Sequence, residues 1–296
     1  MQYSTQNQKV NREMSISNRE GYGKILAKRS VYRLFMLILV AMMMLPIMWI
    51  ISTSLRAPGE SFRLPPSFFP TSFNWRNYVR VFTDVPFFSF ILNSIRVSTI
   101  TIVLQLLFST LAAYAFARIE FVGRTILFLT VLAGLMVPGQ AVIVPRFLVI
   151  IGFGMMDSHS ALIIPALADP LGIFILRQFM LTIPKSYDEA AYIDGASRFR
   201  IYSRIILPMT KPCIVIVLIM RLIAVWNDFF NPLIFINTFD KMTLPLGLTI
   251  LDGFMGTGNV SVILAGVTLS LVPPLLVYLF GQKYLLQGTT LAGLKS

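Results

Sequence analysis

Cysteine, histidine and charged residues are scarce in this chain of 296 residues. Cys213 is its one cysteine and His159 its one histidine. A single cysteine excludes an intrachain disulfide and any metal site built from several cysteines. A single histidine leaves little for histidine-based metal binding or acid–base chemistry. Charged residues make up 13% of the chain, whereas soluble domains usually carry about 25%, so the composition indicates a protein surrounded largely by lipid.

Catalytic and nucleotide-binding motifs are also missing from the sequence. No G-x-x-x-x-G-K-[ST] pattern occurs, and the nearest string, GYGKILAK at 21–28, has the wrong spacing for a P-loop. Asp188 and Glu189 are adjacent, so on a helix they point in different directions and make a poor acid–base pair. We therefore predict a non-catalytic chain with no metal or cofactor of its own, and we interpret Cys213 as a small helix residue.

Hydrophobic residues make up 56% of the chain and are gathered into long runs. Six runs of about 20 residues are long enough to cross the hydrocarbon core of a membrane as helices. They lie near 31–54, 88–117, 125–146, 160–181, 212–236 and 261–286. We predict an all-α, polytopic membrane protein with six spans. Residues 31–296 form its single transmembrane domain, and residues 1–30 form a polar, partly disordered cytoplasmic tail.

The third run leads into a stretch that is broken by proline and glycine, PGQAVIVPRFLVIIGFGMM at 138–156. Pro138 and Pro145 each remove a backbone hydrogen-bond donor, so we expect them to bend or end the helix. Irregular backbone at membrane depth survives only where protein or a water-filled cavity surrounds it. We predict a broken or re-entrant segment here.

Basic residues collect on one side of the predicted spans. With the N-terminus in the cytoplasm, seventeen of the 25 lysines and arginines lie on the inner side, six on the outer side, and Arg96 and Arg221 within spans. Cytoplasmic loops carry the excess of basic residues in membrane proteins. We therefore predict cytoplasmic termini and a cytoplasmic segment at 182–211, between spans four and five. The same bias explains the net charge of +12 without nucleic acid as a partner.

The predicted cytoplasmic segment contains the string EAAYIDGASRFRIYSRIILP at 189–208. Ser186 is a predicted N-cap, because Glu189 follows three residues later as in a capping box. Asp188 and Glu189 also place negative charge in the first turn, where the helix dipole favours it. Gly195 predicts a bend or a close approach by a partner backbone.

An apolar face follows the same segment at helical spacing. The residues at this spacing are Tyr192, Ala196, Phe199, Tyr202 and Ile206. Asp194 and Arg198 lie four residues apart on another face and are predicted to pair. The residues alone leave two interpretations open, namely a helix lying on the cytoplasmic membrane surface or a surface made for another protein.

A longer motif in this segment resembles a known family. The inner-membrane permeases of binding-protein-dependent ABC importers carry EAA, three residues, Gly, nine residues, Ile, one residue and Leu-Pro. This chain has Glu189-Ala190-Ala191, Gly195, Ile205 and Leu207-Pro208 at that spacing. The strings at 93–124, 225–235, 244–248 and 281–296 resemble its sugar-importer branch, the group that contains the second permease of the maltose transporter. The resemblance covers about residues 30–296.

The resemblance implies that the cytoplasmic segment forms two short helices that dock into a groove on an ATP-hydrolysing subunit. The residues implied in this coupling are Glu189, Ala190, Ala191, Asp194, Gly195, Ala196, Leu207 and Pro208. It also implies a bacterial plasma-membrane assembly of this chain, a second permease, two copies of an ABC ATPase that carry ATP and Mg, and an extracellular solute-binding protein. The substrate would be a sugar.

Polar residues inside the predicted spans are the candidates for a substrate pathway, because charge at membrane depth is costly and usually faces a bundle interior or an aqueous cavity. These candidates are Asn93, Arg96, Arg221, Asn227, Asp228 and Asn231. A structural interpretation stays open, in which Arg221 pairs with a carboxylate of a partner subunit and Arg96 extends outward. If Arg221 lines the cavity, it favours an acidic oligosaccharide. A permease for an amino acid or polyamine, and a membrane scaffold without transport, are the alternative functions.

Overall fold

The structure is a computed structural model that describes residues 29–57, 60, 68–255 and 259–293, with the side chains of 252–255 and 284–293 left aside. Residues 1–28 of the predicted tail lie outside the described part of the chain. Over the described ranges the regular structure is entirely helical, with no strand. The prediction of an all-α fold is therefore confirmed.

Four helices are long and apolar enough to cross a membrane, and a bent pair of helices makes a fifth candidate. The four are Arg29–Ser54, α3 (Phe87–Arg118), the stretch Ser160–Thr182 that contains α6 and α7, and Val260–Lys283 at the start of α14 (Val260–Gly293). The bent pair joins Arg198–Met209 to α11 (Lys211–Trp226) at 74°. These five match the first, second, fourth, sixth and fifth predicted runs.

The third predicted run does not form one helix. α4 (Arg124–Ala133) ends at Ala133, and a series of turns leads from Gly134 to α5 (Ile143–Gly152). The prediction that residues 125–146 form one helix is therefore wrong. Pro138 lies in the turns, and Pro145 lies in the first turn of α5, where a missing N–H costs no helical hydrogen bond. The broken character predicted for 138–156 is confirmed.

Two other spans are interrupted as well. α6 (Ser160–Ala166) is separated from α7 (Pro170–Thr182) by a break whose last residue, Asp169, caps α7. α11 is followed after Asn227 by the short α12 (Phe230–Phe235). The other described helices are α2 (Arg76–Thr83), α8 (Ser186–Ile193), α9 (Arg198–Ile201), the π-helical turn η2 (Tyr202–Ile206), α10 (Leu207–Met209), the 3₁₀ turn η3 (Phe239–Lys241) and α13 (Leu244–Met255).

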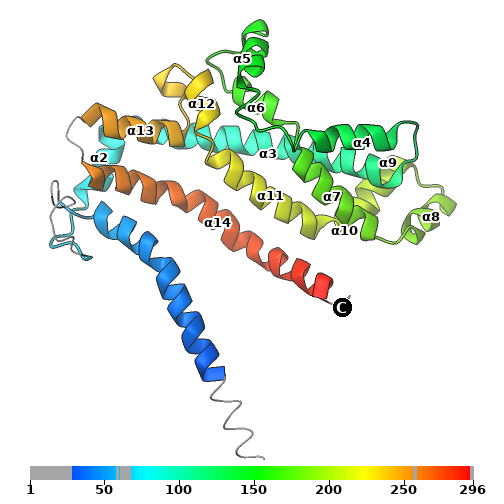
Figure 1. Ribbon diagram of the computed structural model, residues 1–296, viewed down its shortest axis with the longest axis horizontal. Coiled ribbons are helices and arrows are strands. Elements are labelled where there is room, and N and C mark those ends of the chain that lie inside the picture. The colour runs from blue at the N-terminus through cyan, green and yellow to red at the C-terminus, as the bar shows by residue number, and fades with distance from the viewer. Residues whose placement is uncertain (1–28, 58–59, 61–67, 256–258, 294–296) are drawn as a thin grey trace, which may run out of the picture.

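By contrast, α3 runs without interruption for 32 residues, because neither proline nor glycine occurs between its ends. It lies along the length of the helical body, with α8 and α9 at one end and α2 and α13 at the other (Figure 1). Small and polar side chains such as Ser98, Thr101 and Ala113 are buried along it, which lets α7 and α11 approach closely.

The N-terminal helix Arg29–Ser54 lies apart from the body along most of its length (Figure 1). Its apolar side chains are exposed, whereas Ser54 at its end is buried and hydrogen-bonded to the Tyr78 hydroxyl of α2 at 2.8 Å. Such an exposed apolar helix is stable only when lipid or another membrane chain covers it.

Candidate functional site

The segment between α7 and α11 forms two helical arms joined by a turn. The first arm is α8 (Ser186–Ile193), and the second consists of α9 (Arg198–Ile201), the π-helical turn η2 (Tyr202–Ile206) and α10 (Leu207–Met209). Gly195 in the turn has φ +77°, a left-handed conformation that glycine adopts without a steric penalty. The bend predicted at Gly195 is confirmed.

Because of this bend, the predicted single apolar face is divided between two surfaces. Tyr192 and Phe199 are exposed, whereas Tyr202 and Ile206 are buried against the body. The predicted pairing of Asp194 with Arg198 is wrong, since Arg198 Nε donates to the Tyr192 hydroxyl at 3.1 Å instead.

The start of α8 also differs from the prediction. Lys185 occupies the N-cap position without a side-chain cap, and Ser186 is the first helical residue. The helix begins one residue early because Lys185 is already in the helical region and its carbonyl accepts from the Asp188 and Glu189 amides at 2.9 and 3.1 Å. The capping box is therefore wrong, but the acidic first turn is confirmed.

The residues implied in coupling fall into an outer and an inner set. Glu189, Ala190, Asp194, Gly195 and Pro208 are exposed, whereas Ala191 is buried and Ala196 and Leu207 are half-buried. Large apolar side chains lie exposed around the outer set, and these are Tyr187, Tyr192, Ile193 and Phe199. An acidic group and small residues surrounded by exposed aromatic side chains are typical of a protein-binding surface.

The inner side of the segment is attached to the end of α3. Arg118 Nη1 pairs with Asp188 Oδ2 at 3.2 Å, and Arg118 Nη2 donates to the Ile183 carbonyl at 2.7 Å. Burial raises the pKa of the Asp188 carboxyl, and the Arg118 charge opposes that effect only in part. The sequence analysis missed both residues of this pair as site residues, although Asp188 stands directly before the motif.

Two more polar contacts join the second arm to α3. The Tyr114 hydroxyl donates to the Arg198 carbonyl at 3.2 Å, and Thr110 Oγ1 lies 2.8 Å from the Tyr202 hydroxyl. Around them an apolar cluster combines Ala191 and Ile201 with residues of α3, α7 and α11. The segment is therefore a packed part of the body whose outer surface is free.

Within the spans, Arg221 of α11 forms an ion pair with Asp169, at the break between α6 and α7. Asp169 Oδ1 also accepts from the Gly172 amide at 2.9 Å. The Asp169 side chain is 1% exposed and that of Arg221 22% exposed. The carboxylate thus belongs to this chain, so the interpretation with a partner-subunit carboxylate is wrong. The Asp-Pro pair at the start of α7, an N-cap signature, was the available signal for Asp169.

Asn93 and Arg96 of α3 differ in their surroundings. Asn93 Nδ2 donates to the carbonyls of Asp240 and Met242 at 2.7 and 3.0 Å, so its donor is used to hold the loop after α12. Arg96 is exposed, with no hydrogen bond or ion pair to the described part of the chain. Among these two, only Arg96 is free to meet a ligand or a partner.

The other three candidates lie between the end of α11 and the first turn of α12. Asn227 is exposed and donates to the Ile223 carbonyl at 2.9 Å. Asp228 Oδ2 accepts from Asn231 Nδ2 at 2.8 Å, and Asn231 Oδ1 accepts from Arg146 Nη1 of α5 at 3.0 Å. The structure thus brings Asp228 and Asn231 together with Arg146 of α5.

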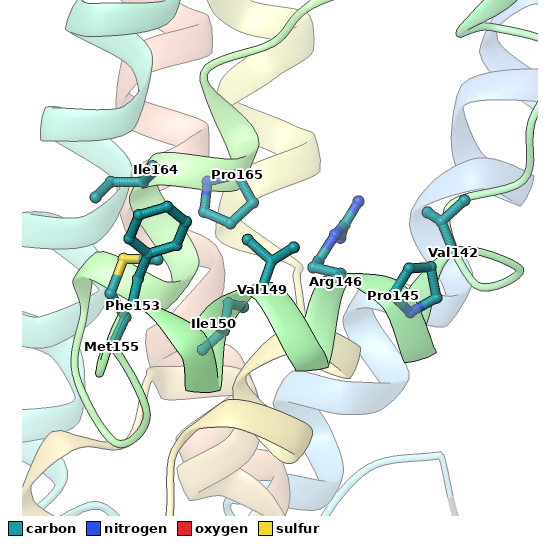
Figure 2. A pocket seen from close by; sticks show the side chains of 9 residues that line it. All are labelled: Val142, Pro145, Arg146, Val149, Ile150, Phe153, Met155, Ile164 and Pro165. Carbon is teal, nitrogen blue, oxygen red and sulfur yellow. The ribbon is translucent and has the colours of Figure 1, made fainter.

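A groove of about 610 Å³ lies beside this network, between α5 and α6. Figure 2 shows Arg146 among the apolar side chains that line it, such as Val149, Phe153 and Pro165. Sugar recognition needs several convergent polar groups, and this groove offers one, which is already bonded to Asn231. The groove is therefore a largely apolar surface.

Asp157 fixes the loop after α12 to the loop after α5. It has φ +54°, and its carboxylate accepts from the Asn237 and Thr238 amides at 2.9 and 2.8 Å and from Lys241 Nζ at 2.9 Å. These donors, with the Thr238 hydroxyl first, hold the pKa of the Asp157 carboxyl well below its usual range. Asn93 and Asp157 therefore both hold the loop after α12 in place, against α3 and against the loop after α5.

Comparison with known proteins identifies the kind of molecule. Residues 22–290 match the family described as binding-protein-dependent transport system inner membrane component. The arabinooligosaccharides transport system permease protein AraQ of Halalkalibacterium halodurans is 33% identical over 253 residues, 84% of this chain and 90% of that protein. The protein of the same name from Bacillus subtilis is 32% identical over 90% of this chain and 97% of its own length.

A solved structure has the same fold. It is a bacterial ABC transporter involved in the import of the acidic polysaccharide alginate, with a TM-score of 0.76 and 24% identity over 86% of this chain and 95% of that chain. The resemblance seen in the EAA motif is confirmed at the level of the family, and the apolar helices make this a multi-pass membrane protein. The chain belongs to the family of inner-membrane components of binding-protein-dependent transport systems.

Proposed function

We propose that this chain is a permease subunit of an ATP-driven importer of oligosaccharides and forms half of the translocation pathway. The match to permeases named for arabinooligosaccharides, over most of both chains, supports a sugar as the substrate class. These relatives favour a sugar over an amino acid or a polyamine. A membrane scaffold without transport is disfavoured by the family itself.

The exposed surface of α8 carries the coupling proposal. Four residues of the implied coupling set are exposed on this surface, namely Glu189, Ala190, Asp194 and Gly195. The inner side of the segment is packed and ion-paired to the rest of the molecule. A force applied to the surface therefore moves the whole helical body and does not merely bend a loop. The Glu189 carboxylate can accept from an arginine of the ATPase, and Ala190 permits close approach. ATP and Mg bind on that ATPase, so this chain is not itself an enzyme.

We further propose six spans with both termini in the cytoplasm. The third span would consist of α4 and the turns that follow it, surrounded by protein where its backbone is irregular. The fifth would consist of α11 and α12. The excess of basic residues on the side of the α8 segment supports this orientation, and it places the Asp157 attachment on the outer side.

The assembly would contain a second, different permease, two ATPase copies and a solute-binding protein outside the cell. The exposed apolar side chains of Arg29–Ser54 require a cover, which the second permease and membrane lipid together supply. Arg96 is exposed on α3 and has no ion pair with the described part of the chain, so it is suited to the pathway or to that second permease, since a charge at membrane depth needs water or a counter-ion.

Neutral oligosaccharides are the favoured substrates, because Asp169 balances the charge of Arg221 within the chain. Acidic oligosaccharides are the second candidate, favoured by the 22% of the Arg221 side chain that stays exposed. Asn227, Asp228 and Asn231 would supply polar groups at the outer end of the pathway in either case.

The deciding experiment measures ATP hydrolysis by the assembled complex with its binding protein, across neutral and uronate-containing oligosaccharides, amino acids and polyamines. Stimulation by neutral oligosaccharides is expected. Stimulation by amino acids or polyamines alone would disprove the sugar assignment. Co-purification with the ATPase is expected for wild type and is expected to be lost in Glu189→Lys and Gly195→Val. If wild type and both variants alike fail to co-purify with any ATPase, the transporter assignment is contradicted.

A further inference from the structure

The α8 segment, residues 183–210, follows α7 and precedes α11 in the sequence. Its hydrogen bonds and its ion pair with distant helices, however, are made with α3. Within the described part of the molecule, each hydrogen bond or ion pair that links residues 183–210 to a distant helix ends on α3. The α3 residues that make these contacts are Thr110, Tyr114 and Arg118. They occupy successive turns of one face of the helix.

The contacts are well shielded from water. The side chains of Arg118 and Asp188 are 5% and 13% exposed, and the Thr110–Tyr202 contact is buried. Apolar packing reaches α7 and α11 as well, but such packing is not directional. Hydrogen bonds are directional, and those from Arg118 to the Ile183 carbonyl and from Tyr114 to the Arg198 carbonyl lie on either side of α8, so α8 is held in register with α3.

The far end of α3 is fixed in a similar way. Asn93 binds the carbonyls of Asp240 and Met242, and Ser94 Oγ accepts from the Leu244 amide at 2.7 Å. These contacts hold the loop between α12 and α13, at the opposite end of the helix from α8 (Figure 1). A helix of 32 residues is about 48 Å long at a rise of 1.5 Å per residue, so α3 joins the two ends of the molecule directly.

The two spans next to the α8 segment in the sequence are less continuous than α3 and are therefore less able to transmit movement along their length. The span formed by α6 and α7 is broken before Asp169, and α11 meets the preceding arm at 74° and ends at Trp226. Breaks of this kind absorb displacement as changes in backbone dihedral angles. α3 contains no such break among its 32 residues.

We propose that α3 is the element that carries movement from the coupling surface to the outer loop at 236–243, with Arg118, Tyr114 and Asp188 as positioning residues. This inference rests on the proposed function, because it assumes that α8 receives the push of an ATPase. Force on α8 passes from Asp188 to Arg118 of α3. Tyr114 holds the second arm against α3, and Asn93 connects the movement of α3 to the outer loop.

The test uses the complete transporter in proteoliposomes with its binding protein and measures oligosaccharide uptake and ATP hydrolysis separately. Arg118→Ala is expected to keep the ATPase bound while uptake per ATP falls about tenfold, within the 5–150-fold range typical of coupling between sites. The exchange Arg118→Asp with Asp188→Arg restores the ion pair but not the hydrogen bond from Arg118 to the Ile183 carbonyl, so partial recovery of coupling is expected. Arg124→Ala is the matched control and is expected to behave like wild type, because among the described residues the Arg124 side chain bonds only the nearby Ile119 carbonyl.

Unchanged uptake per ATP in Arg118→Ala would overturn the inference. If that variant fails to assemble, Tyr114→Phe decides, because it removes only the hydroxyl bonded to the Arg198 carbonyl, and wild-type coupling there would equally overturn the route through α3. Glu189→Lys separates the two proposals. Normal uptake in Glu189→Lys would disprove the coupling surface itself, whereas lost uptake in Glu189→Lys with normal Arg118→Ala would disprove only the role of α3.

Discussion

The ion pair between Asp169 and Arg221 allows a prediction of how much one intramembrane contact contributes to stability. Asp169 has two roles, since one carboxylate both pairs with Arg221 and caps α7 through the Gly172 amide. Asp169→Asn keeps a capping oxygen and removes the charge, whereas Asp169→Ala removes both. The two variants therefore separate the ion pair from the cap.

The expected magnitudes follow from burial. Breaking a buried ion pair by removing one partner costs about 3–5 kcal/mol, because the other charge is left uncompensated. The Arg221 side chain is 22% exposed, so water screens part of that charge and the lower end of the range applies. We expect a loss of about 3 kcal/mol in Asp169→Asn, and about 1 kcal/mol more in Asp169→Ala from the lost cap.

The assay is reversible unfolding of the purified chain by titration with a denaturing detergent, followed by helical circular dichroism. Arg221→Leu and the double variant Asp169→Asn, Arg221→Leu complete a double-mutant cycle. The double variant is expected to lose less stability than the sum of the single variants, because no charge is left alone. Additivity of the single losses within about 0.5 kcal/mol, as found for independent sites, would refute an energetic link between the two side chains.

Three further predictions concern other contacts. Glu189→Lys is expected to abolish uptake while the protein stays in the membrane, since it reverses the charge on the exposed face of α8; quantitative immunoblotting of membranes together with uptake measurement checks this, and normal uptake would contradict it. Gly172→Ala is expected to destabilise by about 1–3 kcal/mol through overpacking, because its Cβ would lie 2.8 Å from Asp169 Cγ; Gly139→Ala, which has open space around it, is the control, and equal denaturation midpoints would count against the clash. Because the pKa of Asp157 is lowered, its contribution to stability is present above the usual carboxyl range and is lost only as the pH falls through the lower native pKa. Protease cleavage in the 236–243 loop should therefore stay slow at pH 5 in wild type and become faster in Asp157→Asn. Equal cleavage rates in the two proteins would argue against the attachment.

The sequence predicted the helical class and the membrane runs well, because those depend on local composition. The exception is instructive. Residues 125–146 are apolar enough to span a membrane, yet α4 ends at Ala133, since the turns that contain Pro138 lie where a straight helix would continue. Hydropathy measures the preference for lipid and says nothing of where the backbone turns, so the length of the run overestimated the length of the helix.

The candidate site shows a similar division between what is local and what is not. The bend at Gly195 and the acidic first turn of α8 depend on neighbouring residues and were predicted. The partner of Asp188 lies 70 residues earlier in the chain, on α3, and the partner of Arg221 lies 52 residues earlier. A motif contains no information about which distant helix its inner face will meet.

This division explains why the intramembrane residues were identified more easily than interpreted. The cost of a buried charge marks Arg221 from the sequence alone, but that cost can be met by a substrate, a partner subunit or the chain itself. The structure supplies Asp169 as the counter-ion and Asp240 and Met242 as the acceptors for Asn93. Arg96 keeps no such contact among the described residues, so of the two basic residues predicted within the spans it is the one whose counter-ion lies outside the described part of the chain. Replacement of Arg96 by leucine should therefore leave the stability of the isolated chain unchanged and alter only assembly or uptake, whereas a loss of stability measured by detergent titration would show that Arg96 is a structural residue.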